Sequence, residues 1–479
     1  MSDRRAKLGE TLREDFPTFV QKCFMTLEPG KRLERNWHIR HIAYHLARVR
    51  AGEERRLIVN IPPRHLKSVT VTVAYTAWAM GHDPSLRVMT VSYAQELARK
   101  HAADFRTIVR SDWYRELFPG FAITHDRQMK ISTSQHGYRY AGSVGGSILG
   151  LGADLIVIDD PIKAQDALSE AERRKVKEFY DSTLYTRLND KQRGAIVLVM
   201  QRLHEDDLVG HVLGHEDWTH VAIPAIETEI RSYRVGSLPD DLHHRAPGDL
   251  IQPDRENQAV LDQMRRTLGS MGFSSQYQQD PMPVDGNAIR RTWLRFYDEP
   301  PAFQLTMVSW DTASTLGETS DYSVGTVWGL ADGDLYLLDV IRDKFEVPDL
   351  RKKITETHLR YRAHATLIEE TDIGRALVQD MRRKGPVKPI LHRVRFDKKA
   401  RLLAQAPKFE AGQVLLPRQA PWLDDYTREL LAFPNGAHDD QVDSTSQALN
   451  WLSGRMAVAR PPRRPNPTRP DGIRPSDTA

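Results

Sequence analysis

Cysteine is almost absent from this sequence, because Cys23 is the only one among 479 residues. A single cysteine excludes an internal disulfide and any zinc site built from several cysteines. No apolar run approaches the ~18 residues of a membrane span. The polar start, Met1-Ser2-Asp3, lacks the apolar segment of a secretion signal. We therefore expect a cytosolic protein that is not bound to a membrane.

A strong excess of one charge is also missing. The chain has 68 Lys and Arg against 64 Asp and Glu, a net charge of +4, which permits a nucleic-acid partner without demanding one. Only the end of the sequence is asymmetric: residues 455–479 hold six Arg, six Pro and two Asp. Such a segment cannot bury a core, so we expect 456–479 to be a disordered Arg/Pro-rich tail, either solvated or binding DNA or a partner.

A loop with part of a phosphate-binding pattern follows the first buried strand, at 57–61. The usual pattern is Gly-x4-Gly-Lys-Ser/Thr; here Lys67-Ser68 are present, whereas Ile61 and Leu66 replace both glycines. Backbone N–H groups at a helix N-terminus suit phosphate. We expect Lys67 to reach the β- and γ-phosphates of ATP, Ser68 to bind Mg²⁺ and Arg64 to add charge at the γ-phosphate. The alternative is a surface lysine that begins a helix.

An acidic pair, Asp159-Asp160, ends the apolar run 155–158. In nucleotide-driven motors the first such carboxylate holds Mg²⁺, and the second orients or deprotonates the attacking water. A strand-ending turn before Pro161 is the alternative. Together with Lys67-Ser68, the pair favours an ATPase.

A second set of acids lies far downstream. Asp311 and Glu369 each end an apolar strand pattern, and Asp440 and Asp443 open the last helix on one face. Two-metal nucleases need carboxylates that converge on two divalent ions ~4 Å apart. Hard oxygen ligands suit Mg²⁺ or Mn²⁺, so all four are predicted to bind metal and to be catalytic. Asp439 suits the helix N-cap better than a metal.

Two patterns of alternation predict the fold class. Strands at 57–61, 86–91, 155–158 and 195–200 alternate with helices at 69–80 and 94–109, which predicts a parallel sheet covered on both faces. From 305 the order is three strands that begin with a hairpin, helix, strand, helix, strand and a final helix at 439–452, as in a ribonuclease H-like fold. We expect an α/β protein in which a P-loop NTPase-type domain precedes a ribonuclease H-like nuclease domain. The predicted parts are a helical segment at 1–50, the ATPase at 51–245, a linking subdomain at 246–300, the nuclease at 301–455 and the tail at 456–479.

Three segments together resemble the large terminase subunit of tailed phages, an ATP-driven DNA-packaging motor and nuclease. They are Ile61–Ser68, Gly145–Lys163 and Val199–Leu208, and the resemblance extends over about 30–455. Leu66 departs from the glycine that the family usually has. Asp160 stands where the family often has Glu.

The resemblance also implies roles for single residues. Gln201-Arg202 matches the coupling motif, so Arg202 is expected to sense the γ-phosphate, with an ordinary strand-end charge as the alternative. The nuclease triad would be Asp311, Glu369 and either Asp440 or Asp443. The adenine contacts would be Trp37, His38 and His41, although core helix residues are the more ordinary interpretation. The segment Phe273–Pro281 resembles the family's bridge between motor and nuclease. Asp321 is an extra metal ligand or a turn residue, and Glu370 and Asp372 are acids that lie beside the site in the sequence.

The predicted function is ATP-driven translocation of double-stranded DNA into a capsid, with metal-dependent cutting of concatemeric DNA. The cofactors would be ATP and Mg²⁺, with Mn²⁺ possible at the nuclease site. By resemblance, the partners are DNA, a portal protein, a small terminase subunit and the procapsid, with a homo-oligomeric ring on the portal. We expect the protein in the host cytoplasm and transiently at the procapsid portal, and not in the mature particle. The alternatives are a helicase or remodelling ATPase, a resolvase-type nuclease with an inactive ATPase half, and a non-enzymatic capsid component.

Overall fold

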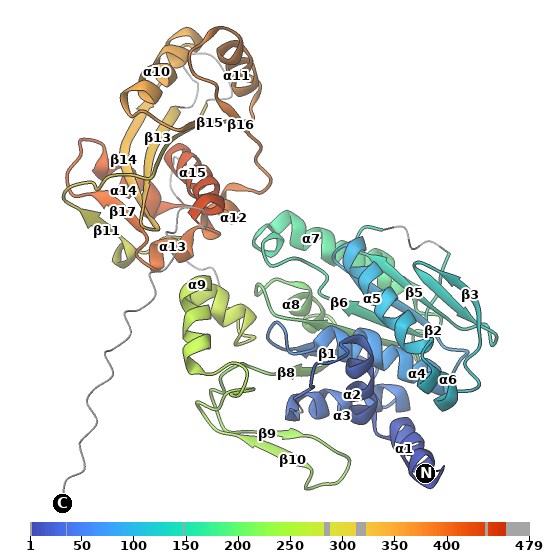
Figure 1. Ribbon diagram of the computed structural model, residues 1–479. Helices are drawn as coiled ribbons and strands as arrows, with labels where there is room; N and C mark the ends of the chain where they lie inside the picture. Colours follow the sequence, from blue (N-terminus) through green and yellow to red (C-terminus); the bar gives the residue numbers. More distant parts are fainter. Residues whose placement is uncertain are drawn as a thin grey trace, which may run out of the picture. The chain divides into compact units, whose positions relative to one another are not determined.

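The computed structural model describes residues 2–34, 36–146, 148, 150–281, 288–312, 322–435 and 439–456. The chain divides into two compact units, Met1–Gly286 and Asn287–Ala479, and each contains its own large sheet (Figure 1). No helix in the described part of the chain is long and apolar enough to cross a membrane. The predicted tail beyond 456 and Asp321 lie outside the described residues.

The sheet of the first unit has the order β3-β4-β5-β2-β6-β7-β1-β8. In this spatial order, the six strands β5, β2, β6, β7, β1 and β8 run parallel. Its strands are β1 (Arg56–Asn60), β2 (Arg87–Ser92), β3 (Ile123–Arg127), β4 (Lys130–Thr133), β5 (Tyr138–Ser143), β6 (Leu155–Asp159), β7 (Ala195–Met200) and β8 (Thr219–Ala222).

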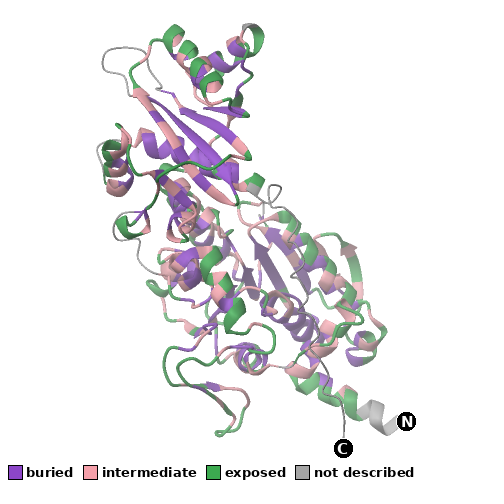
Figure 2. Cartoon of the chain, turned by 60° about the vertical axis from the view of Figure 1, so that its left-hand side comes forward, coloured by how far each residue is buried: buried purple, intermediate pink, exposed green. Residues whose placement is uncertain are grey.

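Alternate residues of the central strands enter two different cores. Leu57 and Val59 belong to one apolar cluster, and Ile58 belongs to another, because successive side chains point to opposite faces of a sheet. Both faces are therefore covered, as the continuous apolar runs predicted. Figure 2 shows the same burial along the central strands of both sheets.

Helices cover the first sheet. The α-helices are α1 (Ser2–Glu14), α2 (Phe16–Leu27), α3 (Trp37–Ala51), α4 (Thr76–His82), α5 (Gln95–Val109), α6 (Asp112–Leu117), α7 (Glu170–Phe179), α8 (Leu208–Leu213) and α9 (Gln258–Gln276). Shorter or wider turns are η1 (Ser68–Tyr75), η2 (Asp166–Leu168), η3 (Tyr180–Leu184) and η4 (Tyr185–Arg187). The helix expected at 69–80 thus begins as a π-helix, η1, where the β-branched run 69–73 crowds an α-helical backbone.

The stretch from 227 to 281 contains a β-hairpin as well as helix α9. Strands β9 (Arg231–Arg234) and β10 (Leu242–Arg245) form an antiparallel hairpin. Ile251 and Phe273 pack into the core of the first unit. The expected linking subdomain, 246–300, is thus shared between the two compact units, which divide after Gly286.

The second unit has a mixed sheet of order β11-β17-β14-β13-β12-β15-β16. Its strands are β11 (Arg295–Tyr297), β12 (Leu305–Asp311), β13 (Ser323–Ala331), β14 (Asp334–Asp343), β15 (Ala365–Glu369), β16 (Ile390–His392) and β17 (Val414–Pro417). Its helices are η5 (Arg291–Trp293), α10 (Val347–Arg360), α11 (Asp372–Lys384), α12 (Lys398–Leu403), α13 (Ala406–Glu410), α14 (Leu423–Ala432) and α15 (Asp440–Met456). Strands β12, β13 and β14 are antiparallel neighbours, whereas β12 and β15 are parallel.

Helix α15 packs against β12 and β13 through hydroxyl groups. Ser444 Oγ donates to the carbonyl oxygen of Ser309 at 2.9 Å, and it lies 2.8 Å from Thr326 Oγ1. These contacts fix the first turn of α15 beside the end of β12.

Candidate functional sites

The loop between β1 and η1 owes its shape to two left-handed residues. Arg64 has φ +66° and Leu66 has φ +60°, a region that costs most L-residues energy and that glycine enters readily. Leu66 therefore adopts at the second glycine position the kind of backbone conformation that glycine usually supplies. Leucine at this position therefore strains the backbone of the loop, which keeps its left-handed turn.

Substitution of Leu66 tests this strain. We expect Leu66→Gly to be more stable than Leu66→Ala by about 1 kcal/mol, because both lose the side chain and only alanine keeps the left-handed penalty. The free energy of unfolding, measured in urea, checks the difference. At the exposed helical position Ala103 the order should reverse, with Ala103→Gly costing about 1 kcal/mol. An alanine at 66 as stable as glycine would contradict the left-handed assignment.

The structure brings the predicted phosphate-loop residues and the acidic pair together. Lys67 Nζ lies 2.6 Å from Asp160 Oδ1, and Ser68 Oγ donates to Asp159 Oδ1 at 3.1 Å. Thr72 Oγ1 donates to the second oxygen of Asp159 at 2.6 Å. Parallel neighbours β6 and β7, next to β1, place these groups at one edge of the sheet.

Burial governs the electrostatics of this cluster. It raises the pKa of Asp159 and of Asp160, and the Lys67 charge opposes that rise. His101 Nδ1 lies 3.6 Å from Asp159 Oδ2 without a hydrogen-bond partner, and burial lowers the pKa of His101 to about 4. Sequence reasoning missed Thr72 and His101. Thr72 follows Ser68 by four residues, and this spacing could have predicted that both lie on one helix face. No pattern in the sequence connects His101 with Asp159.

A cavity of about 590 Å³ adjoins the loop and is lined by Arg64, His65, Leu66, His38 and Arg255, among others. Burial lowers the pKa of His38 to about 3 and that of His65 to about 4, so both rings are neutral near pH 7. The cavity therefore offers cationic Arg64 and Arg255 beside neutral rings.

The three residues considered as adenine contacts lie in different surroundings. Trp37 is half-buried and stacks on His243, with ring centroids 4.6 Å apart. His38 and His41 are buried, as expected of core helix residues, and the His41 ring lies 2.7 Å from the carbonyl oxygen of Arg234. Of the three, only His38 lines the cavity beside the phosphate loop.

Arg202 is held by its own loop. Its Nε donates to Asp207 Oδ2 at 3.0 Å, and Asp207 also caps α8 by accepting from Gly210 N at 3.0 Å. The backbone N–H of Arg202 donates to Gln279 Oε1 at 3.0 Å. The predicted coupling residue is thus joined to the end of the predicted bridge segment, and its guanidinium is engaged by Asp207.

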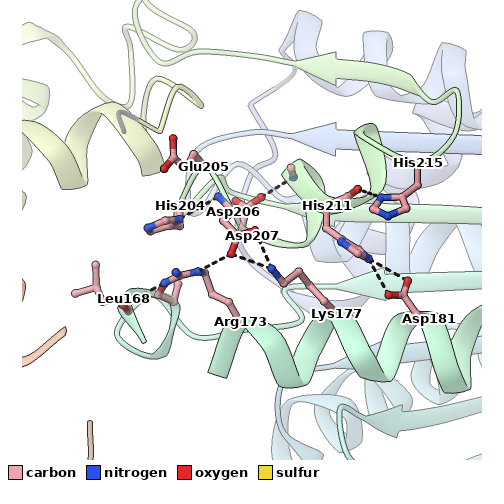
Figure 3. A network of polar contacts seen from close by, with 12 residues as sticks. Leu168, Arg173, Lys177, Asp181, His204, Glu205, Asp206, Asp207, His211 and His215 are labelled. Atoms are coloured by element: carbon pink, nitrogen blue, oxygen red, sulfur yellow. Dashed lines mark hydrogen bonds and ion pairs between the residues drawn. The ribbon is translucent and has the colours of Figure 1, made fainter. Parts of the chain in front are cut away.

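The same loop is tied to α7. Lys177 Nζ lies 2.8 Å from both carboxylate oxygens of Asp206, and Arg173 Nη1 donates to the carbonyl oxygen of Ala167 at 2.8 Å (Figure 3). Ala167 lies only a few residues after the acidic pair. Arg173 Nε also donates to Asp206 Oδ2 at 3.4 Å, so a continuous polar network joins the loop after β6 to the loop after β7.

In the second unit the predicted acids gather at one sheet edge. Asp311 follows Trp310, whose register partner on β15 is Ile368, so Asp311 and Glu369 end neighbouring parallel strands. Burial, and then the charges of Glu369, Asp443 and Asp440, raise the pKa of Asp311 well above its usual range. Burial raises the pKa of Asp443 to about 6. The charges of the other three predicted carboxylates therefore disfavour the ionised form of Asp311.

Basic side chains hold several of these acids. Arg401 Nη2 lies 2.8 Å from Asp443 Oδ1, and Lys398 Nζ lies 2.9 Å from Asp443 Oδ2. Lys398 also lies 2.6 Å from Asp439, directly before α15. Arg342 Nη2 is 3.9 Å from Asp440 Oδ2. Sequence reasoning missed these cations, although the basic stretch 393–401 was a visible signal.

The donor set suits a hard divalent cation, because it consists of carboxylate oxygens. Glu369 Oε2 is buried without a hydrogen-bond partner, which is unusual for a charged oxygen and is compatible with binding a cation. Yet no three His, Cys, Asp or Glu side chains among the described residues are grouped closely enough to hold a metal ion together. Asp443 and Asp440 instead form ion pairs with basic side chains.

The acids beside the site behave differently. The Asp372 side chain is 98% exposed and lies 3.5 Å from Arg375. Glu370 Oε1 accepts from the same arginine at 3.3 Å. Neither contributes to the charges that raise the pKa of Asp311 most strongly.

Residues 308–452, which include all four predicted nuclease acids, match the family model of the terminase RNase H-like domain. This segment is a terminase ribonuclease H-like domain. No curated protein matches the chain significantly in sequence.

Solved structures extend the likeness of the terminase nuclease domain to most of the chain. The large terminase of a thermophilic bacteriophage matches with a TM-score of 0.53 and 12% identity, over 85% of this chain and 98% of that chain. Its complexes with ADP and with ATP-gamma-S match with TM-scores of 0.55 and 0.54, each at 11% identity and the same coverage. At such identity the likeness shows a common fold. The domain family and the fold together support a phage large terminase, that is, a DNA-packaging protein with a nuclease domain, as the sequence predicted.

Proposed function

We propose that this chain hydrolyses ATP to move double-stranded DNA into a capsid and cuts concatemeric DNA with a metal-dependent nuclease site. One observation carries the proposal: two separate acid clusters, each at the edge of its own sheet, stand on one chain. The first is paired with Lys67 at 2.6 Å, and the second lies within the terminase RNase H-like domain.

In the motor unit, Lys67 would exchange Asp160 for the β- and γ-phosphates, and Arg64 would add positive charge beside them. Ser68 and Asp159 would hold Mg²⁺, which supplies charge neutralisation on the phosphates. Release of Lys67 would leave Asp160 to orient the attacking water. The complexes of the thermophilic phage's terminase with ADP and ATP-gamma-S support a nucleotide in this fold.

Arg202 would report the state of the γ-phosphate. Its ion pair with Asp207 and the hydrogen bond to Gln279 support a role in coupling, because one residue is joined to both the α8 cap and the bridge segment. The guanidinium holds Asp207 and the backbone N–H holds Gln279, so a movement of Arg202 would alter both contacts. Hydrolysis would thereby change the backbone that leads toward the second unit.

In the nuclease unit, Asp311, Glu369 and Asp443 would hold two divalent ions, with Asp440 as a further ligand. Bound metal would supply an activated water and stabilise the leaving oxygen. The buried Glu369 Oε2, which has no hydrogen bond, and the effect of the other three acids on the pKa of Asp311 support this assignment. The protein's own part is to hold the carboxylates on neighbouring strand ends and on the first turn of α15.

The metal requirement is tested directly. Purified protein should cut supercoiled plasmid in Mg²⁺ or Mn²⁺ and lose all cutting in excess EDTA, because the acids alone cannot activate water. Re-addition of Mn²⁺ to the same sample should restore cutting, which excludes unfolding by the chelator. Cutting that persists in EDTA would contradict the two-metal site.

The partners follow from the likeness to phage large terminases. We propose double-stranded DNA, a portal protein, a small terminase subunit and the procapsid as partners, with several copies of the chain forming a ring on the portal. The place would be the host cytoplasm and transiently the portal. Translocation must ignore sequence, so the motor would contact mainly the DNA backbone. A helicase would leave the acids of the second unit without use, and a resolvase-type nuclease would leave the Lys67 cluster without use.

A further inference from the structure

The acid cluster of the second unit is neutralised by two cations from one short helix, α12. Asp397 caps α12 by accepting from Ala400 N at 2.9 Å, which fixes the direction of the turn that carries Lys398 and Arg401. Together these two residues occupy both carboxylate oxygens of Asp443, at 2.9 and 2.8 Å.

The contact between Arg401 and Glu369 is incomplete. Arg401 Nη1 lies 3.7 Å from Glu369 Oε2, and both atoms are buried without a hydrogen-bond partner. Buried charged atoms usually find a partner. Arg401 therefore leaves Glu369 Oε2 without a hydrogen bond, and a cation bound to Glu369 would supply the missing partner.

A divalent ion and the two cations compete for the same oxygens. A metal ion on Asp443 would stand beside the positive charges of Lys398 and Arg401, and like charges at such distances repel strongly. Both side chains must then withdraw from Asp443. Lys398 can do so easily, because its side chain is 48% exposed and rests on a flexible stem.

We propose that Lys398 and Arg401 hold the metal-free nuclease site closed and exchange its carboxylates for DNA phosphates when metal binds. The proposal rests on the metal-dependent nuclease proposed above. Phosphate is the natural second partner, because arginine binds it through two parallel hydrogen bonds and lysine binds it as a point charge. The surroundings agree, since Arg393, Arg395 and Lys399 are exposed in the same stretch. Lys398 and Arg401 are thus positioning residues that link metal loading to DNA binding.

Metal binding without DNA provides the first test. Mn²⁺ is titrated calorimetrically into the full chain without nucleotide, and the Asp311→Asn protein defines the background from other sites. Lys398→Gln and Arg401→Gln should each bind Mn²⁺ about tenfold more tightly than the unaltered protein, since each removes a competing positive charge. Lys399→Gln, on the same helix but outside these ion pairs, should bind as the unaltered protein does. Should Arg401→Gln fail to fold by circular dichroism, the exposed Lys398 carries the same test.

DNA binding provides the second test. The affinity for a short duplex is measured in Ca²⁺ at several salt concentrations, and the duplex is checked afterwards for cutting. In Lys398→Gln and in Arg401→Gln, loss of one phosphate contact should lower the magnitude of the slope of log affinity against log salt by about 0.9. An unchanged Mn²⁺ affinity would overturn the competition, and an unchanged slope would overturn the exchange for phosphate. If the unaltered protein shows no Mn²⁺ binding that depends on Asp311, the proposed nuclease site itself is wrong.

Discussion

Lys67→Ala is expected to lower DNA-stimulated ATP hydrolysis by at least about a hundredfold while metal-dependent DNA cutting continues. A preorganised charge that faces developing negative charge is worth roughly a hundredfold to a thousandfold in turnover. Lys67 is such a charge, because it is buried and its Nζ lies 2.6 Å from Asp160. Phosphate release with and without DNA, measured beside plasmid cutting on the same preparation, checks both halves.

Two further variants sharpen this result. Lys100→Ala, at an exposed position of α5, should leave ATP hydrolysis unchanged. Arg202→Gln should retain nucleotide binding yet hydrolyse slowly, because its proposed role begins only when the γ-phosphate is present. Normal ATP hydrolysis by Lys67→Ala would remove the motor from the proposed function. Loss of both activities would point instead to unfolding.

Asp311→Asn is expected to have the reverse effect, lowering DNA cutting by at least about a hundredfold and sparing ATP hydrolysis. The amide keeps the shape of the side chain but loses the charge needed to hold a divalent ion, which supplies several kcal/mol of transition-state stabilisation. Plasmid cutting in Mg²⁺ and in Mn²⁺ measures the loss. Asp372→Asn provides the matched control, since this acid lies at the same sheet edge but is 98% exposed.

Stability separates a lost ligand from a damaged fold. Burial, and then the neighbouring carboxylates, raise the pKa of Asp311, so its ionised form is unfavourable in the folded, metal-free protein. Asp311→Asn removes that charge and should melt at the same temperature or higher without metal. Cutting that continues undiminished in this variant would place the nuclease site elsewhere.

Strand ends were predictable because their signal is local. The apolar runs that precede Asp159, Asp311 and Glu369 are buried strands, and a carboxylate directly after such a run must lie at a sheet edge. Lys67 and Ser68 were predictable for the same reason, since they follow β1 and begin η1. The arrangement of hairpin strands, helices and final helix likewise indicated the ribonuclease H-like fold.

Other features depend on atoms far apart in the chain. The hairpin of β9 and β10 was not predicted, because both strands are short and consist mostly of polar residues. His101 approaches Asp159 only because α5 packs beside β2 and η1. Asp159 and its basic or hydroxyl neighbours are dozens of residues apart in the sequence. No periodic pattern of residues predicts that such distant side chains come into contact.

The two acid clusters show where local pattern ends and tertiary structure begins. The sequence by itself determined which carboxylates stand at strand ends, because the apolar run that forms a buried strand and the carboxylate that ends it are consecutive residues. Only the tertiary structure decided their ion-pair partners, which are Lys67 for Asp160, and Lys398 with Arg401 for Asp443. It also decided that Leu66 adopts a left-handed backbone. Ion pairs and backbone dihedrals of this kind arise when the folded chain brings distant charges together and closes a loop between fixed ends.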